Sequence, residues 1–264
     1  MNHFSTSDLS LLLVEPSDMQ RKVIIKHLHQ EGIQKIEQAA TLTEAKQRLG
    51  SHQPDLIACA LHFSDGTAVD LLHFIHQQPA LAATPFMLVS SEHRKSQLEQ
   101  FKQSGVIAIL PKPFTADHLG MALNAAVDLL TPSELELSLF DVHDVRVLVV
   151  DDSTLARNHI QRVLRNMGIQ HLMEAKDGKE AIAILQQQMF DLVVTDYNMP
   201  EVNGQELTSY IREQSQQAHI PILMVTSEAN DAHLSTVEQA GVNALCDKPF
   251  APETVKSLLF KLLE

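Results

Sequence analysis

The sequence has little of what marks several common classes of protein. Its 264 residues include only two cysteines, Cys59 and Cys246, and each lies in a short apolar run that predicts a buried strand. The longest early apolar run, residues 11–14, is far too short for a signal-peptide core or a membrane span. Positive charge is also scarce, because the formal net charge is −13. Such a surface repels nucleic-acid phosphates and anionic lipids, so we expect a cytoplasmic protein without direct nucleic-acid binding or membrane insertion.

The composition favours folded domains. Hydrophobic residues make up 44% of the chain and charged residues 20%, which is ordinary for globular protein and too apolar for a disordered one. A chain of 264 residues exceeds one typical small domain and is long enough for two.

The chain repeats itself over the length of a whole domain. A shift of 136 positions superimposes its two halves without a gap. The run Lys112-Pro113-Phe114 then falls on Lys248-Pro249-Phe250, and several apolar and glycine landmarks also coincide. A duplication explains this pattern, and it divides the chain into a polar leader (1–8), a first domain (9–130), a linker (131–144) and a second domain (145–264).

Each half alternates short aliphatic runs with longer segments that are apolar at helical spacing. In the second half, the predicted strands cover residues 146–150, 171–174, 192–195, 222–226 and 244–246. The predicted helices include 158–167, 178–187 and 253–263. This alternation is typical of βα units, and it predicts a doubly wound α/β domain with a five-stranded parallel sheet. Ligands of such sheets bind beyond the carboxyl ends of the strands.

The predicted linker has a different character. A Thr-Pro-Ser break precedes alternating acidic and apolar residues through Leu135, Leu137, Leu139 and Phe140. We favour a short amphipathic helix packed between the domains over a free tether.

Five polar side chains lie at the carboxyl ends of the predicted strands of the second half. Asp151 and Asp152 follow the first strand and Asp196 the third, Thr226 ends the fourth, and Lys248 comes after the fifth. Three carboxylates at one sheet edge repel each other unless a cation is present, and all-oxygen ligation suits Mg²⁺. A nucleophilic carboxylate, a divalent metal, an ammonium and a hydroxyl together favour a phosphoryl-transfer site. Any one of these acids alone would be interpreted as a solvated loop residue.

These residues lie in four motifs, residues 149–153 (VVDDS), 195–200 (TDYNMP), 225–229 (VTSEA) and 247–250 (DKPF). In this order and at domain-scale spacing they resemble the receiver domains of bacterial two-component response regulators, particularly the single-domain chemotaxis type. The resemblance covers the second half and implies a flavodoxin-like (βα)₅ fold.

The resemblance also implies roles for the site residues. Asp196 would be the phosphoacceptor, attacking the phosphohistidine of a histidine kinase or phosphotransfer protein, or an acyl phosphate. Asp152 and Asp196 would ligate Mg²⁺ directly, Asp151 would act through water, and Asn198 would contribute its backbone carbonyl. Lys248 would pair with the phosphoryl group.

The remaining implied roles concern the switch. Thr226 would move toward the phosphoryl group and shift the loop that follows its strand. Asn198 and Glu228 occupy positions that influence how fast the phosphoryl group hydrolyses. The family commonly has Tyr or Phe three residues before the lysine, where this chain has Leu245, so the usual aromatic switch is missing.

The first half has lost the chemistry. Ala60 aligns with the predicted phosphoacceptor, and Glu15 and Pro16 align with the acid pair. Ser90 and Lys112 remain. Because a methyl group cannot be phosphorylated and proline has no carboxylate, we expect a pseudo-receiver that acts as an interaction module. The alternative is a passive evolutionary remnant.

The sequence shows no helix-turn-helix, cyclase signature or kinase core. We therefore expect a phosphorylation-gated adaptor that binds a downstream protein or forms a homodimer. Catalysis would be limited to self-phosphorylation and autodephosphorylation at Asp196. The alternatives are a phosphate sink for a kinase, or the regulatory part of a longer protein with an output domain such as a cyclase. A flavodoxin-like electron carrier is disfavoured, because a phosphate-cradling loop after the first strand is absent.

Overall fold

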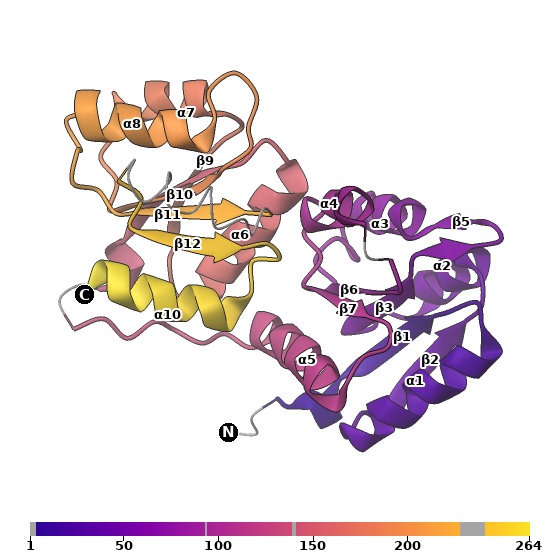
Figure 1. The fold of residues 1–264 in the computed structure, drawn as a ribbon. Helices are drawn as coiled ribbons and strands as arrows, with labels where there is room; N and C mark the ends of the chain where they lie inside the picture. The colour runs from indigo at the N-terminus through magenta and orange to yellow at the C-terminus, as the bar shows by residue number, and fades with distance from the viewer. Residues whose placement is uncertain (1–3, 93, 139–140, 228–240) are drawn as a thin grey trace. The chain divides into compact units, whose positions relative to one another are not determined.

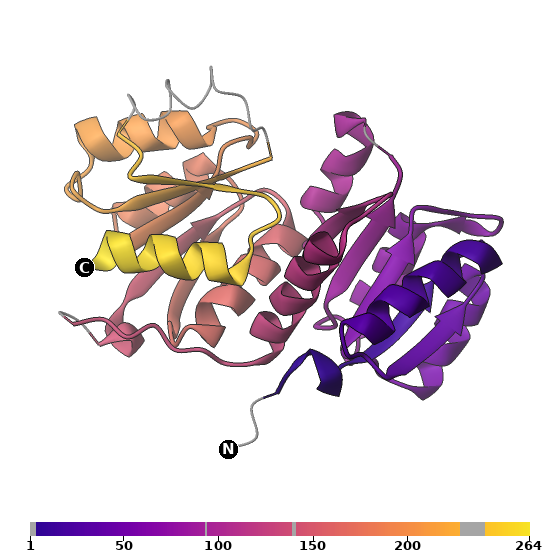
Figure 2. The same ribbon diagram turned by 60° about the horizontal axis from the view of Figure 1, so that its bottom comes forward.

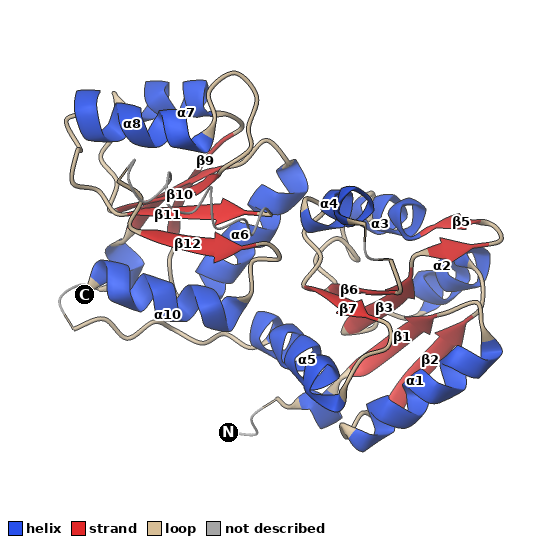
Figure 3. Cartoon of the chain, viewed as in Figure 1, coloured by secondary structure: helices blue, strands red, loops and turns tan. Residues whose placement is uncertain are grey.

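The computed structural model of the chain describes residues 4–92, 94–138, 141–227 and 241–264. The chain divides into two compact units, residues 1–131 and 132–264. Each unit contains a five-stranded parallel sheet with helices on both faces, which confirms the predicted fold class (Figures 1 and 3). Throughout the described part of the chain, every helix is too short or too polar to cross a bilayer.

The first unit has the strand order β2-β1-β3-β6-β7. Its sheet consists of β1 (Ser10–Val14), β2 (Lys35–Ala39), β3 (Leu56–Ala60), β6 (Phe86–Ser90) and β7 (Ala108–Pro111). Its helices are η1 (Thr6–Asp8), α1 (Asp18–Gln30), α2 (Leu42–Ser51), α3 (Ala68–His76), α4 (Lys95–Lys102) and α5 (Ala116–Leu130). A small antiparallel pair, β4 (His62–Phe63) and β5 (Gly66–Thr67), follows β3.

The second unit repeats this topology with the order β12-β11-β10-β8-β9. Its strands are β8 (Arg146–Val150), β9 (His171–Ala175), β10 (Leu192–Asp196), β11 (Ile222–Thr226) and β12 (Ala244–Asp247). Its described helices are η2 (Val142–Asp144), α6 (Thr154–Asn166), α7 (Gly178–Leu185), α8 (Gly204–Gln214) and α10 (Pro252–Leu263).

The central strands are buried on both faces because helices cover both sides of each sheet. All five residues of β3, of β10 and of β11 are buried. In the second unit, α6 and α10 lie on one face and α7 and α8 on the other; in the first, α1 and α5 lie opposite α2 and α3 (Figures 1 and 2). Continuous aliphatic runs are typical of such doubly covered parallel strands. Both thiols are buried as well: Cys59, in the central strand β3, is 0% exposed, and Cys246, in the edge strand β12, is 3% exposed.

The order of the strands determines where a ligand site can form. From β8 the chain goes outward to β9 and then returns to β10 on the other side of β8, so the winding reverses between β8 and β10. In doubly wound sheets ligands bind at the carboxyl edge where the strand order reverses in this way.

Helix α6 begins four residues earlier than we predicted from the sequence. The hydroxyl of Ser153 accepts a hydrogen bond from the Ala156 amide at 3.3 Å and caps the first turn, which starts at Thr154. The predicted start at Asn158 was therefore wrong. In fact the helix begins two residues after Asp152.

The amphipathic helix predicted in the linker is wrong over residues 132–138, which form no helix; the end of the linker forms the short helix η2 (Val142–Asp144). The Ser133 amide donates to Asn166 O and the Leu135 amide to Met167 O, each at 2.9 Å. Leu135 is only 3% exposed. Because these amides bind the end of α6, they are not available for the internal hydrogen bonds of a helix. Residues 139 and 140 lie outside the described residues.

Two glycines hold the loop that follows β10. The Gly204 amide donates to Tyr197 O at 3.0 Å, and a Cβ on Gly204 would come closer than 3.0 Å to the carbonyl oxygen of Asp196. A Cβ on Gly178 would come 2.5 Å from the carbonyl oxygen of Val202. The loop therefore depends on close backbone approach at both ends.

The first unit has Leu42 and Ala68 at the positions equivalent to these glycines. Its loop after β3 instead forms the β4–β5 hairpin, and the carboxylate of Asp65 accepts hydrogen bonds from the amides of Leu42 (3.1 Å) and Thr43 (2.9 Å). The same strand framework thus carries a different loop.

We predict that Gly204→Ala lowers the free energy of unfolding of the second unit by about 1–3 kcal/mol, because the new Cβ overlaps backbone that cannot easily move. Gly50→Ala is the control: a Cβ there meets nothing within 4 Å, and alanine should favour helix α2 by up to about 1 kcal/mol. Calorimetry of the full chain measures both effects. An unchanged melting transition in Gly204→Ala would contradict the predicted overlap.

Candidate functional site

Four of the predicted site residues meet at the carboxyl edge of the second sheet. Asp151 directly follows β8, Asp196 ends β10, Thr226 ends β11 and Lys248 directly follows β12. Their exposed fractions are 0%, 1%, 6% and 5%, so all four are buried. Parallel strands present their carboxyl ends on one side, which is why residues far apart in the sequence converge here.

One ammonium bridges two carboxylates. Lys248 Nζ lies 2.8 Å from Asp151 Oδ2 and 3.1 Å from Asp196 Oδ1. The Lys248 amide also donates to Thr226 O at 2.7 Å, which joins the ends of β12 and β11. Because buried charges are costly without partners, these contacts fix the three charged side chains relative to one another.

The oxygens of the two buried carboxylates differ in their other hydrogen bonds. Asp151 Oδ1 accepts from the Ser153 amide at 2.8 Å, and Asp196 Oδ1 from the Tyr197 amide at 2.9 Å. Asp196 Oδ2 is buried and has no hydrogen-bond partner. A buried acceptor without a partner carries a desolvation penalty of about 1–3 kcal/mol, so this atom is suited to an incoming cation or electrophile.

Three acids provide a set of oxygen donors. Asp151, Asp152 and Asp196 each offer one carboxylate oxygen, and these atoms lie within 4.8 Å of one another. Asp152 is exposed, whereas the other two are buried. Such an all-oxygen set, open to water on one side, fits a hard divalent cation such as Mg²⁺.

Burial dominates the electrostatics of the cluster. It raises the pKa of Asp196 to about 7, although the Lys248 charge acts in the opposite direction. Burial also raises the pKa of Asp151 above its ordinary value, again against Lys248. For Lys248 itself, burial disfavours the charge, but the two carboxylates outweigh burial and the net shift of its pKa is upward. One lysine therefore offsets only part of the acidic charge, which leaves room for a cation.

The other predicted residues of this unit lie around the cluster. Asn198 is exposed in the loop after β10, and Leu245 is half-buried in β12, paired in register with Met224 of β11. Glu228 lies outside the described residues.

The first unit places its aligned residues at the same edge of its own sheet. Glu15 directly follows β1, Ala60 ends β3, Ser90 ends β6 and Lys112 directly follows β7. Pro16 comes next to Glu15 and carries no carboxylate. Ala60 is 6% exposed and presents only a methyl group.

The lysine of the first unit has a different set of partners. Lys112 Nζ lies 2.6 Å from Glu15 Oε2 and also donates to Gln20 Oε1 at 2.5 Å. Glu15 Oε1 accepts from the Ser17 amide at 3.0 Å, as Asp151 does from its own serine. Thus Gln20, on α1, supplies the second acceptor that Asp196 supplies in the second unit.

Sequence reasoning missed two residues, Gln20 and Arg157. Gln20 aligns with Ala156, so no motif could single it out. Arg157 lies on α6 and donates to the carbonyl oxygen of Asp151 at 2.7 Å. An arginine six residues after an acid gives no signal in the sequence, because its contact is with backbone.

A family model described as the response regulator receiver domain matches residues 11–124 and 147–260. Chemotaxis protein CheY-3 of Vibrio cholerae is 39% identical over 121 residues, which cover 46% of this chain and 93% of that protein. Chemotaxis protein CheY of Pseudomonas aeruginosa is 38% identical over 120 residues, covering 46% of this chain and 97% of the relative.

Among solved structures, chemotaxis protein CheY4 of Vibrio cholerae is 36% identical, with a TM-score of 0.43, covering 45% of this chain and 98% of that one. The matched segments correspond to the two repeated α/β units, each with its own five-stranded parallel sheet. This chain therefore belongs to the response regulator receiver family and carries two receiver domains in tandem.

Proposed function

We propose that the chain is a two-component response regulator in which Asp196 accepts a phosphoryl group from a histidine kinase or a phosphotransfer protein. The observation that carries the proposal is the Asp196 carboxylate, which has one oxygen paired with Lys248 and the other buried without a partner. The family match and the chemotaxis relatives support this general role.

The transfer is a substitution at phosphorus. A carboxylate oxygen of Asp196 forms the new P–O bond while the P–N bond to the donor histidine breaks, and the bonding electron pair stays on the imidazole nitrogen. Lys248, which already contacts Asp196, is placed to offset negative charge on the phosphoryl oxygens.

Asp151, Asp152, Asp196 and the backbone carbonyl of Asn198 would hold Mg²⁺. When bound, the ion supplies positive charge that neutralises the phosphoryl oxygens. The support for this assignment is the donor set itself, three carboxylate oxygens within 4.8 Å of one another.

The signal would leave the site through β11 and β12. Thr226 would turn toward the phosphoryl group, and because its carbonyl accepts from the Lys248 amide, the ends of the two strands would respond together. Leu245 offers no hydroxyl and less reach than an aromatic residue, so coupling would depend on aliphatic repacking against its neighbours. The result would be altered binding of a downstream protein or altered homodimerisation.

The first receiver domain would act as a non-phosphorylated interaction module. Its β1 core, residues 11–14, is at most 2% exposed, which supports a maintained fold. Its site lysine is already paired with Glu15 and hydrogen-bonded to Gln20. Its contribution would therefore lie in its surface.

We predict that the full chain, incubated with acetyl phosphate and Mg²⁺, gives one shifted band on Phos-tag electrophoresis, and that Asp196→Asn abolishes it. Asparagine keeps the shape of the side chain but cannot form the acyl phosphate. Asp191→Asn is the matched control, because Asp191 directly precedes the same strand, at the opposite end from Asp196, and pairs with Arg146. A shift that persists in Asp196→Asn would mean that the phosphoacceptor is misassigned.

Restoring the missing acid of the first domain should not restore its chemistry. We predict that Ala60→Asp, made in the Asp196→Asn background, gives no shifted band under the same conditions. Pro16 still lacks a carboxylate for the metal, and Lys112 stays engaged by Glu15 and Gln20. The appearance of a shifted band would show that position 60 alone had silenced this domain.

A further inference from the structure

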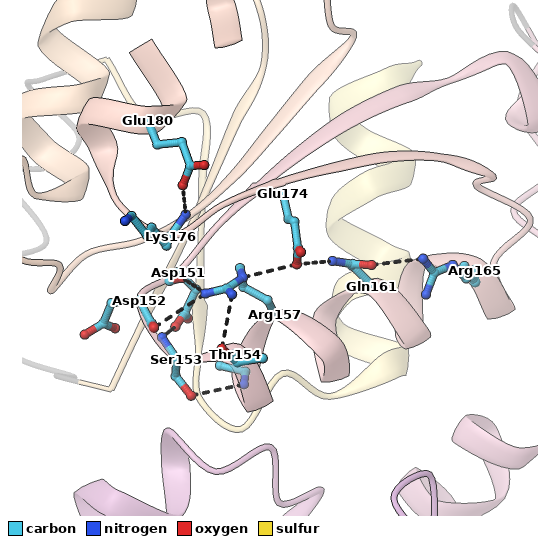
Figure 4. A network of polar contacts seen from close by, with 11 residues as sticks. Asp151, Asp152, Ser153, Thr154, Arg157, Gln161, Arg165, Glu174, Lys176 and Glu180 are labelled. Atoms are coloured by element: carbon cyan, nitrogen blue, oxygen red, sulfur yellow. Dashed lines mark hydrogen bonds and ion pairs between the residues drawn. The ribbon is translucent and has the colours of Figure 1, made fainter. Parts of the chain in front are cut away.

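The buried guanidinium of Arg157 contacts the backbone of the acid pair. Arg157 is 8% exposed, and its Nη1 donates to the carbonyl oxygen of Asp151 at 2.7 Å and, more weakly, to that of Asp152 at 3.4 Å (Figure 4). The exposed carboxylate of Asp152 extends away from Arg157 in this view. Arg157 therefore acts on the acid pair through its backbone.

The guanidinium is itself held on its other sides. Arg157 Nη2 donates to Thr154 Oγ1 and Nε to Glu174 Oε2, each at 3.2 Å. Glu174 Oε2 also accepts from Gln161 Nε2 at 3.0 Å, and Gln161 Oε1 accepts from Arg165 Nη2 at 2.9 Å (Figure 4). The rigid, planar fork of arginine is suited to joining several acceptors in fixed directions.

The first domain offers an internal comparison. Arg21, equivalent to Arg157, donates to the carbonyl oxygen of Glu15 at 2.7 Å. Its other nitrogen, Nη2, pairs with Asp18 of its own helix at 3.1 Å. At the position equivalent to Glu174 the first domain has Gln38, which has no charge. The contact between an arginine and a carbonyl oxygen thus occurs in both domains. The pair between Arg157 and Glu174, a residue of the second strand, occurs in the domain that keeps its acid pair.

We propose that Arg157 is a positioning residue for the Asp151–Asp152 pair, and that Glu174 holds Arg157 in place. This inference rests on the proposed function, because it assigns Arg157 to the Mg²⁺ site of the second receiver. By binding the carbonyls of two consecutive residues, the guanidinium limits rotation of the backbone that carries both carboxylates. Groups that orient metal ligands from outside typically affect metal affinity by about 10–100-fold.

Isothermal titration of the full chain with Mg²⁺ alone tests the proposal. We expect Arg157→Gln to raise the Mg²⁺ dissociation constant by about tenfold or more. Arg21→Gln is the matched control, because it removes the same 2.7 Å contact to a carbonyl in the domain without the acid pair. It should leave the dissociation constant within about twofold of the wild type, a difference of under ~0.5 kcal/mol.

Arg157→Lys separates geometry from charge. Lysine keeps the positive charge, but a single ammonium cannot reproduce the fork that joins two carbonyls and Glu174. We expect it to recover less than half of the binding free energy lost in Arg157→Gln. Full recovery would overturn a positioning role and assign the effect to charge alone.

Other outcomes are equally decisive. A dissociation constant in Arg157→Gln within about twofold of the wild type, or an equal loss in Arg21→Gln, would overturn the proposal. If Arg157→Gln does not fold, Glu174→Gln replaces it: weaker Mg²⁺ binding is expected, and unchanged binding would overturn the role of Glu174. A wild type that neither binds Mg²⁺ nor is labelled by acetyl phosphate would overturn the proposed function itself. A labelled wild type beside an unaffected Arg157→Gln overturns this inference alone.

Discussion

The ammonium of Lys248 lies between the buried carboxylates of Asp151 and Asp196, and much of the second domain is arranged around these three charges. Removing one partner from a buried pair typically costs about 3–5 kcal/mol, because the remaining charge is left without compensation. The ends of β8, β10 and β12 must therefore stay in register. The parallel pairing of β8 with β10, of β10 with β11 and of β11 with β12 provides that register. The helices on both faces of the sheet keep water from its strands.

The first domain meets the same constraint in another way. Lys112 is retained, and a partly buried lysine needs acceptors whether or not the site performs chemistry. Glu15, one methylene longer than aspartate, reaches the ammonium, and Gln20 approaches it from α1. The two domains thus provide acceptors for equivalent lysines in different ways. In the second domain two aspartates do so and leave Asp196 Oδ2 without a partner, whereas in the first domain Glu15 and Gln20 bind the ammonium.

Periodicity and turn residues predicted the strands of the second domain closely, because buried parallel strands are short, continuous aliphatic runs bounded by polar residues. Residues at strand ends were equally predictable, since a parallel sheet brings them to one edge. The contacts that the sequence could not predict are long-range side-chain contacts and hydrogen bonds to backbone groups. Gln20 contacts Lys112 across 92 positions, Arg157 binds carbonyls that every residue possesses, and Leu135 became buried through amides that a helix would have used.

The loop after the third strand is held by different contacts in the two domains. In the second domain, Gly178 and Gly204 permit contacts with backbone carbonyls that no side chain would allow. In the first, Leu42 and Ala68 fill those positions, and Asp65 ties the hairpin to the start of α2. Because Leu42 and Ala68 are both buried, replacing either with glycine would remove packing from the core of the first domain. The two domains therefore share their strands but not this loop, so an acid introduced at position 60 would be followed by a hairpin and not by the loop that the two glycines hold.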